Sequence, residues 1–457
     1  MEGKDLRRSD VLICTSLSSF LTPLSLSAVN VALPKMGSEL KMNLVELNWV
    51  ATSYLISSAC FLLPFGKIAD TYGRKKVFLL GMTLFTFMSL FLSISGSFAT
   101  MVVLRMVQGV GAAMIFGTAL AILSSAFDPK ERGRVLGINV ASVYLGLSLG
   151  PFIGGLITQN LSWRLVFGMN VPIGILVVLC TLAKIKGEWY GKREEGFDFF
   201  GSSLYVLSIS LIVIGFSKIP KIETLPVLTG GVFALLIFAY RESKTGNPIF
   251  QIRMIRKNRV FAYSNLAALI HYGSTHGLSF LMSLFLQNIK GLPPDKTGFI
   301  LVAQPIVQSL LSPFAGRISD KIEPRIVSSI GMGITTTGIL LLSLSKPSTE
   351  VVLILVSLII VGTGFALFAS PNANAIMSSV DPEFYGTASS MVATMRLIGQ
   401  VLSMGVVMIV FSLDVPRRMI DENIHHQFME AFRTTLLIYS SACAFGVIIS
   451  LKRGKIR

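Results

Sequence analysis

The sequence predicts an all-α integral membrane protein, and three observations support this fold class. Of the 457 residues, 52% are hydrophobic and only 14% are charged, whereas a water-soluble domain carries about 25% charged residues. The apolar residues are gathered in runs long enough to cross the hydrocarbon core of a bilayer as helices. These runs also lack the alternating pattern that is typical of a barrel strand, so helices are the favoured spanning structure.

Fourteen apolar stretches are expected to form transmembrane helices. The weakest are 225–240, which is short, and 298–316, which carries two glutamines and two prolines. The connections between most stretches are short, so no soluble domain is expected. The predicted spans are 11–33, 47–66, 77–98, 100–124, 135–157, 164–184, 199–217, 225–240, 260–286, 298–316, 326–344, 351–377, 386–412 and 433–451.

The formal net charge of +16 has two interpretations, a polyanion-binding surface or a membrane topology. When the loops are assigned alternately with the N-terminus inside, most of the 40 Lys and Arg residues fall on cytoplasmic segments, as the positive-inside rule requires. These residues are spread over several segments without an interleaved aromatic platform, so we expect no nucleic-acid partner. The prediction is a multi-pass protein of the plasma (cytoplasmic) membrane with both termini cytoplasmic.

Two basic loops resemble each other and indicate an internal repeat. The loop from Gly66 to Lys76 follows the second span, and the loop from Gly316 to Arg325 follows the tenth. Aligning their first glycines also aligns Asp70 with Asp320. Parallel six-helix repeats are a known transporter plan, although short basic loops can also look alike by chance. The predicted organisation is an N-terminal six-helix half (1–185), a cytoplasmic linker (186–198), two inserted transmembrane helices (199–240) and a C-terminal six-helix half (241–457).

These motifs resemble the major facilitator superfamily, and more narrowly its fourteen-helix drug:proton antiporter family (EmrB/QacA-like). The first basic loop resembles the superfamily signature, and the stretch from Leu104 to Ala113 resembles a basic motif of the fourth helix. The most specific match is an antiporter motif in the fifth helix, carried by Gly137, Gly146, Gly150, Pro151, Gly154 and Gly155. The resemblance implies a major facilitator fold, with two six-helix bundles plus two inserted central helices, and export by alternating access.

The resemblance assigns a gating role to two groups of residues. One is a cytoplasmic latch, in which Asp70 and Arg74 can pair because they are four residues apart on a helix. The other is the glycine face of the fifth helix, which allows close helix packing, with a proline that favours a kink. An ordinary charged turn and simple small-residue packing are the alternatives. The gating candidates are Gly66, Asp70, Gly73, Arg74, Asp320, Gly146, Gly150, Pro151, Gly154 and Gly155.

The sequence lacks the acidic residue that usually couples transport to protons in this family, so other residues are the candidates for coupling. The family places an aspartate in the first helix where this chain has Ser25, and no Asp or Glu lies near the middle of a predicted span. Arg105 and Arg396 are charges within spans, which are usually functional, although Arg105 could instead snorkel to the interface. His271 and His276 are the substitute protonatable groups, with a structural role as the alternative.

The predicted central cavity is polar without being charged. Such a lining suits a small lipophilic or amphipathic substrate, and it could alternatively hold helices together. The candidates are Asn30, Gln108, Tyr144, Phe280, Gln304, Gln308, Asn372 and Asn374.

The function predicted from the sequence is secondary active export of lipophilic or amphipathic compounds, resembling multidrug efflux, with protons as the candidate coupling ion. The alternatives are a transporter of lipids or lipid-like substrates, or a facilitator without proton coupling. A membrane-embedded enzyme is disfavoured because no catalytic cluster is evident. A sensor that has lost its cargo step is disfavoured by the transporter motifs. We expect a monomer surrounded by membrane lipid, with no cofactor and no metal.

Overall fold

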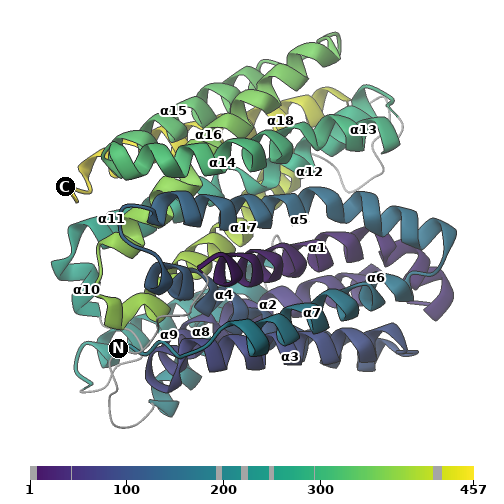
Figure 1. The fold of residues 1–457 in the computed structure, drawn as a ribbon. Coiled ribbons are helices and arrows are strands. Elements are labelled where there is room, and N and C mark those ends of the chain that lie inside the picture. The colour runs from purple at the N-terminus through teal and green to yellow at the C-terminus, as the bar shows by residue number, and fades with distance from the viewer. Residues whose placement is uncertain are drawn as a thin grey trace.

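The structure, a computed structural model, describes residues 8–42, 44–191, 198–217, 225–245, 252–292, 294–414 and 425–456. Helices lie at all fourteen stretches predicted to span the membrane, and they run roughly side by side in one elongated bundle (Figure 1). The all-α prediction is therefore confirmed. Part of the predicted linker, 192–197, lies outside the described residues.

The first seven helices form an N-terminal bundle. In it α1 packs along α5, α2 along α4, and α3 against both α4 and α7. The sixth predicted span is divided between α6 and α7. The bounds are α1 (Arg8–Leu40), α2 (Leu44–Tyr72), α3 (Arg74–Ser93), α4 (Phe98–Ala126), α5 (Arg132–Asn160), α6 (Arg164–Gly168) and α7 (Asn170–Lys184).

The helices from α11 onward form a C-terminal bundle, in which α15 packs against α16 and α18, and α11 against α17. Between the two bundles in sequence, α8 and α9 pair with each other, and α8 contacts α2 and α17. The bounds are α8 (Phe199–Ser217), α9 (Leu225–Glu242), α10 (Ile252–Lys257), α11 (Arg259–Gly273), α12 (His276–Leu284), the π-helix η2 (Phe285–Ile289), α13 (Pro294–Leu301), α14 (Ala303–Lys321), α15 (Pro324–Ser343), α16 (Val351–Ser378), the 3₁₀-helix η3 (Pro382–Phe384), α17 (Tyr385–Asp414) and α18 (His425–Lys452).

Eleven helical segments within the described ranges are long and apolar enough to cross a membrane. The predicted spans 199–217, 225–240 and 260–286 are not among them. The last of these is divided between α11 and α12, because the helix is interrupted at Ser274 and Thr275. The number of fourteen transmembrane helices therefore stays a prediction, while a multi-span helical membrane protein is established.

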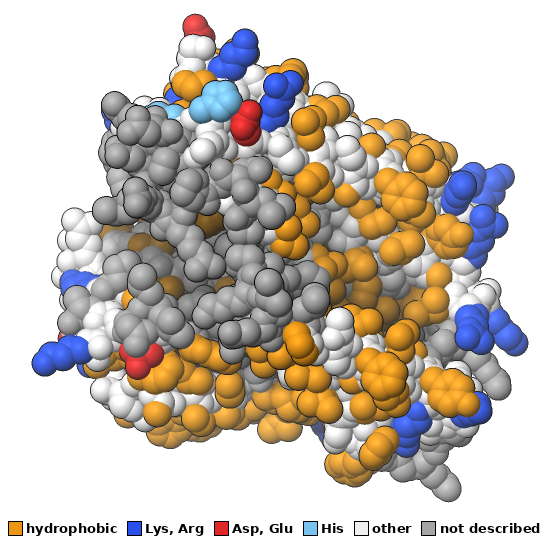
Figure 2. Space-filling model, turned by 180° about the vertical axis from the view of Figure 1, so that it is seen from behind, with side chains coloured by type: hydrophobic (Ala, Val, Ile, Leu, Met, Phe, Trp, Pro, Cys, Tyr) orange, Lys and Arg blue, Asp and Glu red, His pale blue; other side chains and the backbone are white. Residues whose placement is uncertain are grey.

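The surface has the polarity expected of a membrane protein. Figure 2 shows hydrophobic side chains over much of the described surface between the two ends of one face, with the larger group of Lys and Arg side chains at one end. At that end α2 and α14 finish and α5 and α17 begin, and we call it the latch end. The first and last helices also meet this end, since Arg8 pairs with Asp128 before α5, and Arg453 donates to the carbonyl of Pro324 at the start of α15.

The opposite end of the N-terminal bundle is held by a cluster on α1 and α6. Arg164 donates a hydrogen bond to the Glu39 carboxylate, and Trp163 Nε1 donates another over 2.6 Å. Both hydrogen bonds, with that from Arg164 the larger cause, lower the pKa of Glu39 below its ordinary value. The carboxylate therefore stays ionised near neutral pH and joins the two helices there.

Paired glycines bring the two bundles into contact at the latch end. A Cβ added at Gly66 would lie 2.8 Å from the carbonyl oxygen of Gly386, and one added at Gly316 would overlap the backbone of Gly133. The first pair joins α2 to α17, and the second joins α14 to α5. The two contacts are equivalent when Gly66 is aligned with Gly316, so the two similar basic loops occupy corresponding places in the two bundles.

The glycines of the antiporter-like motif in α5 face two different neighbours. Added Cβ atoms at Gly146, Gly150 and Gly154 would overlap α1, whereas one at Gly137 would lie 2.6 Å from the carbonyl oxygen of Ser312 on α14. Gly155 is less confined, because its nearest neighbour would be 3.6 Å away. The glycine face therefore allows α5 to approach α1 within its own bundle and α14 in the other one.

Adding one methyl group to this helix should have different effects on stability at two glycines. Gly146→Ala would push a Cβ into the backbone carbonyl of Phe20, so we expect it to destabilise the protein by about 1–3 kcal/mol. Gly155→Ala is the matched control, and it should be neutral or slightly stabilising because alanine favours helix more than glycine does. Thermal unfolding in detergent measures both variants. Equal melting temperatures for the two would contradict the packing described for α1 and α5.

Candidate functional site

Asp70 connects the two bundles at the latch end. Its carboxylate is almost fully buried, with 3% of the residue exposed, and accepts hydrogen bonds from the backbone N–H groups of Gly386 (2.8 Å) and Thr387 (2.9 Å). These groups belong to the first turn of α17, where N–H groups have no partner within the helix and the helix dipole favours a negative charge. Asp70 therefore caps a helix of the opposite bundle.

Asp320 makes the corresponding contact in the other direction. Its carboxylate accepts hydrogen bonds from the N–H groups of Gly133 (2.8 Å) and Arg134 (2.9 Å) at the start of α5. A carboxylate at the end of α14 thus caps α5, as the carboxylate at the end of α2 caps α17. These two reciprocal contacts, which we call the latch, close one end of the interface between the bundles.

Arg74 supplies the counter-charge for the first contact. Its guanidinium is 2.8 Å from Asp70 Oδ1 and also donates to Ser125 Oγ (2.7 Å) and to the carbonyl of Pro382 (2.5 Å). The predicted pairing of these two residues is therefore present in the structure. The ring of Tyr385 lies beside Arg74, at 5.4 Å from guanidinium carbon to ring centre, and beside Arg132 at 5.1 Å.

The segment after α7 reinforces the latch in a way that sequence reasoning missed. Gly73 has a φ of +118°, which favours glycine, and the chain turns there into α3. The carboxylate of Glu188 accepts from the N–H groups of Lys75 (2.6 Å) and Lys76 (3.1 Å). No spacing in the sequence links Glu188 to α3, because the partners are separated by four helices.

A chain of small cavities lies between the bundles, near the middle of the long helices. Their volumes are about 50, 40 and 80 Å³. The first two share Tyr144 and Arg396, and the last two share Leu397 and Gln400. A drug-sized ligand needs a pocket of about 300–1,000 Å³, so each of these three cavities has room for water molecules but not for such a ligand.

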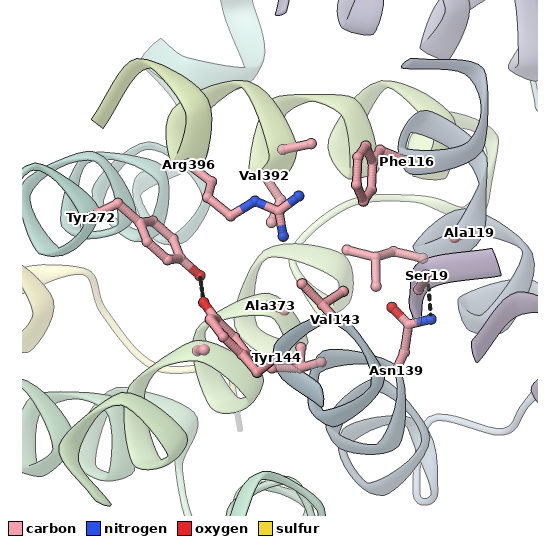
Figure 3. Close-up of a pocket in the computed structure, with 14 residues that line it drawn as sticks. Ser19, Phe116, Ala119, Asn139, Val143, Tyr144, Tyr272, Ala373, Val392 and Arg396 are labelled. Carbon is pink, nitrogen blue, oxygen red and sulfur yellow. Dashed lines mark hydrogen bonds between the residues drawn. The ribbon is translucent and has the colours of Figure 1, made fainter. Parts of the chain in front are cut away.

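The Arg396 side chain of α17 reaches into the first of these cavities (Figure 3). Its guanidinium lies over the ring of Phe116 from α4, at 4.9 Å to the ring centre. No hydrogen bond or ion pair to this guanidinium is found among the described residues, and the residue is only half-buried. Arg396 thus presents a positive charge to the space between the bundles.

Aromatic and amide groups complete the wall around this charge. The hydroxyls of Tyr144 on α5 and Tyr272 on α11 are 3.4 Å apart, and this hydrogen bond joins the two bundles across the cavity. On the other side, Asn139 donates to Ser19 Oγ over 2.9 Å (Figure 3). The wall therefore combines flat apolar surfaces with a few hydrogen-bonding groups, as is usual for sites that bind small organic molecules.

Two of the four coupling candidates are buried away from these cavities. Arg105 is fully buried, donates to Gln108 Oε1 (2.8 Å) and to the carbonyl of Val50 (3.2 Å), and lies over the ring of Tyr54. It joins α4 to α2 rather than snorkelling to the surface. His271 is also fully buried, with its ring 4.0 Å from that of Phe368, centre to centre.

The interruption between α11 and α12 separates the two histidines. His276 begins α12 and lines the third cavity together with Gln400. His276 and Arg396 therefore line adjoining cavities. Ser25, at the position of the family's aspartate, is buried and accepts a hydrogen bond from Asn170 on α7 over 3.0 Å. That hydroxyl is absent from the linings of the three described cavities.

Of the eight residues predicted to line a cavity, only Tyr144 lines one of the three just described. Asn372 and Asn374 instead hold helices together, by hydrogen bonds to Arg453 and to Ser319 respectively. The polar groups of these asparagines are satisfied within the C-terminal bundle, which corresponds to the alternative of polar side chains joining helices.

The remaining five predicted cavity residues also lie elsewhere. Gln108 bonds to Arg105 and Ser89, while Gln308 is fully buried and its amide atoms have no hydrogen-bond partner in the described structure. Of the other three, Asn30 and Phe280 are exposed on the surface, and Gln304 is almost fully buried.

Two helical bundles that meet around a central cavity, with a latch at one end, define the class of protein as a membrane transporter. Residues 15–404 match the model of the Major Facilitator Superfamily, and the chain belongs to this superfamily. Its members are transporters, not enzymes. The fourteen-helix subfamily within it remains a resemblance.

Three named transport or resistance proteins are similar in sequence to most of the chain. The riboflavin transporter RibZ of Clostridioides difficile (strain 630) is 29% identical over 444 residues, which is 96% of each chain. The multidrug resistance protein Stp of Mycobacterium tuberculosis (strain CDC 1551 / Oshkosh) is 30% identical over 86% of this chain and 74% of its own. The cephamycin export protein CmcT of Amycolatopsis lactamdurans is 30% identical, with coverages of 88% and 84%.

Two solved structures have the same fold. The human organic anion transporter MFSD10 has a TM-score of 0.66 at 13% identity, and covers 97% of this chain and 99% of its own. The proton:xylose symporter XylE has a TM-score of 0.70 at 12% identity, with coverages of 98% and 96%. At these identities the comparison shows the fold alone.

Removing the charge of Asp70 should weaken the latch. Asp70→Asn leaves Arg74 buried beside a neutral amide, and breaking a buried ion pair in this way costs about 3–5 kcal/mol. We expect a clear fall in the melting temperature of the detergent-solubilised protein. The control is Asp128→Asn at the same end, because the exposed pair of Asp128 with Arg8 contributes little. If the two variants melted together, the latch would not be a stabilising contact.

Proposed function

We propose that this protein is a secondary active transporter that exports lipophilic or amphipathic compounds by alternating access. In this proposal the chain lies in the plasma membrane with its latch end facing the cytoplasm. The observation that carries the proposal is the cavity between two bundles whose contact is closed at one end by Asp70 and Asp320. Membership of the Major Facilitator Superfamily supports transport. A relative designated as an export protein, CmcT, and one designated as a multidrug resistance protein, Stp, support its direction.

The small cavity volumes imply how the cycle would proceed. A substrate would enter only after the bundles separate on one side, because the present cavities are far smaller than an organic substrate requires. Opening the latch end would require Asp70 and Asp320 to leave the first turns of α17 and α5. A substrate can drive that change only by binding the open conformation more tightly than the closed one.

The gating role proposed for the glycines of α5 follows from the same contacts. Gly137 lies against α14 beside the latch, while Gly146, Gly150 and Gly154 lie against α1. Pro151, inside α5, lacks a backbone N–H and so favours a bend of the helix there. We propose that α5 transmits the state of the latch along its length to the cavity wall at Tyr144.

Proton coupling, as the finer part of the proposal, would rest on His276. The acids of the described spans lie near helix ends, and none lines the three cavities. His276 is the one histidine among the residues that line those cavities, and an imidazole ring can take up and release a proton. His271 and Arg105 are fully enclosed by protein, so we assign them structural roles in support of the cavity.

Riboflavin is the second candidate substrate, and one observation favours it. RibZ matches this chain over 96% of both sequences, whereas Stp extends beyond the match. The aromatic and amide lining at Phe116, Tyr144 and Asn139 can stack on a flat heterocycle and bond to its polar edge.

Transport by the purified protein in liposomes tests the proposed function. We expect riboflavin or an amphipathic fluorescent dye to move against its gradient when a pH gradient is imposed. His276→Gln should abolish the gradient-driven part while leaving passive exchange, and His426→Gln, which alters an exposed histidine, should behave as wild type. Substrate flux that ignores the pH gradient would favour a facilitator, and flux of phospholipid alone would favour a lipid transporter.

A further inference from the structure

The charge balance of the central cavity is unusual for a site that binds lipophilic cations. Arg396 is the single Lys, Arg, Asp or Glu residue among those that line the three described cavities. A cation bound there would face a like charge in a medium of low dielectric constant, where repulsion is much stronger than in water. The cavity therefore disfavours positively charged substrates.

Arg396 also differs from the buried arginines elsewhere in the protein. Arg74, Arg105 and Arg453 each donate hydrogen bonds to carboxylate, amide or carbonyl oxygens. Each of them is thus explained by a contact within the protein. In the described structure no hydrogen bond or ion pair to the guanidinium of Arg396 is found; it lies over the ring of Phe116 and points into the cavity (Figure 3).

The surroundings of this guanidinium define what can bind to it. The ring of Phe116 forms one side of the site. Tyr144 reaches it from α5 of the N-terminal bundle, and Tyr272 from α11 of the C-terminal bundle. A guanidinium presents several N–H donors in one plane and recognises an oxyanion through two parallel hydrogen bonds. The aromatic rings beside it favour a flat apolar body attached to that anion.

We propose that Arg396 is the substrate-binding residue for an anionic group, and that the transported compounds are amphipathic anions with a flat ring system. The anion can be a carboxylate, phenolate, sulfonate or phosphate. This inference rests on the proposed transport function and specifies its substrate class. Binding of the anion would also be linked to closure of the bundles, because Arg396 lies on α17, the helix whose first turn Asp70 of α2 caps.

A pair of dyes of equal size and opposite charge tests the inference. The methyl ester of fluorescein is an anion at neutral pH, and the methyl ester of rhodamine is a cation with the same ring system. Their affinities for the protein in phosphatidylcholine nanodiscs are measured by fluorescence anisotropy. We expect the wild type to bind the anion at least about tenfold more tightly, the factor that corresponds to one charged hydrogen-bonding contact.

Variants at position 396 identify the residue responsible. Arg396→Gln should weaken binding of the anionic dye by about tenfold or more and leave the cationic dye unchanged or improved. Arg396→Lys should restore part of the preference, because it keeps the charge without the planar donors. Arg256→Gln is the matched control, since it removes one exposed positive charge on α10. Melting temperatures near that of the wild type verify that the variants are folded.

The outcomes separate the inference from the function on which it rests. Equal affinity for the two dyes, or an unchanged affinity of Arg396→Gln for the anion, overturns the inference even if liposomes still pump dye. Charge-selective binding without any pumping supports the anion site and counts against export. Including phosphatidylglycerol in the nanodiscs distinguishes the source of the anion: displacement of the dye indicates a lipid headgroup, and retention indicates a soluble compound.

Discussion

The contact on which the rest of the structure depends is a buried carboxylate at the end of one bundle that caps a helix of the other. Asp70 and Asp320 each accept two backbone N–H groups from the first turn of α17 and α5. The Asp70 carboxylate, which is almost fully buried, would be costly to bury without partners, and the N–H groups at the starts of the two capped helices would otherwise need water. The carboxylates and the N–H groups are therefore hydrogen-bonded to each other only while the two bundles are in contact.

This reciprocity connects the latch to the cavity. The helices that the carboxylates cap, α17 and α5, are the same helices that carry Arg396 and Tyr144 into the central cavity. The glycine pairs Gly66–Gly386 and Gly316–Gly133 let the backbones approach closely enough for the caps to form. A change at the latch must therefore displace the cavity wall, and an anion held by Arg396 would act on the latch through the same helix.

The sequence predicted the residues of the latch and the pairing of Asp70 with Arg74, but neither the helix starts that the two carboxylates cap nor the cavity. The latch residues Asp70, Arg74 and Asp320 lie in short motifs with fixed spacing. The repeat of those motifs predicts that Asp70 and Asp320 have equivalent positions in the two bundles. Cavity residues carry no such spacing. Whether Asn372 faces a substrate or Arg453 depends on helix rotation and on a partner 81 residues away. Likewise, the interruption of one predicted span at Ser274 and Thr275 turns His276 towards the cavity and leaves His271 buried.

The distance between the bundles at the latch end is the most direct test of the account. Spin labels at the exposed positions Lys130, before α5, and Arg256, on α10, would report it by double electron–electron resonance. We expect one narrow, short distance in the wild type and an additional, longer distance in the Asp70→Asn, Asp320→Asn double variant. An unchanged narrow distribution in the double variant would contradict the claim that these two carboxylates hold the latch end closed.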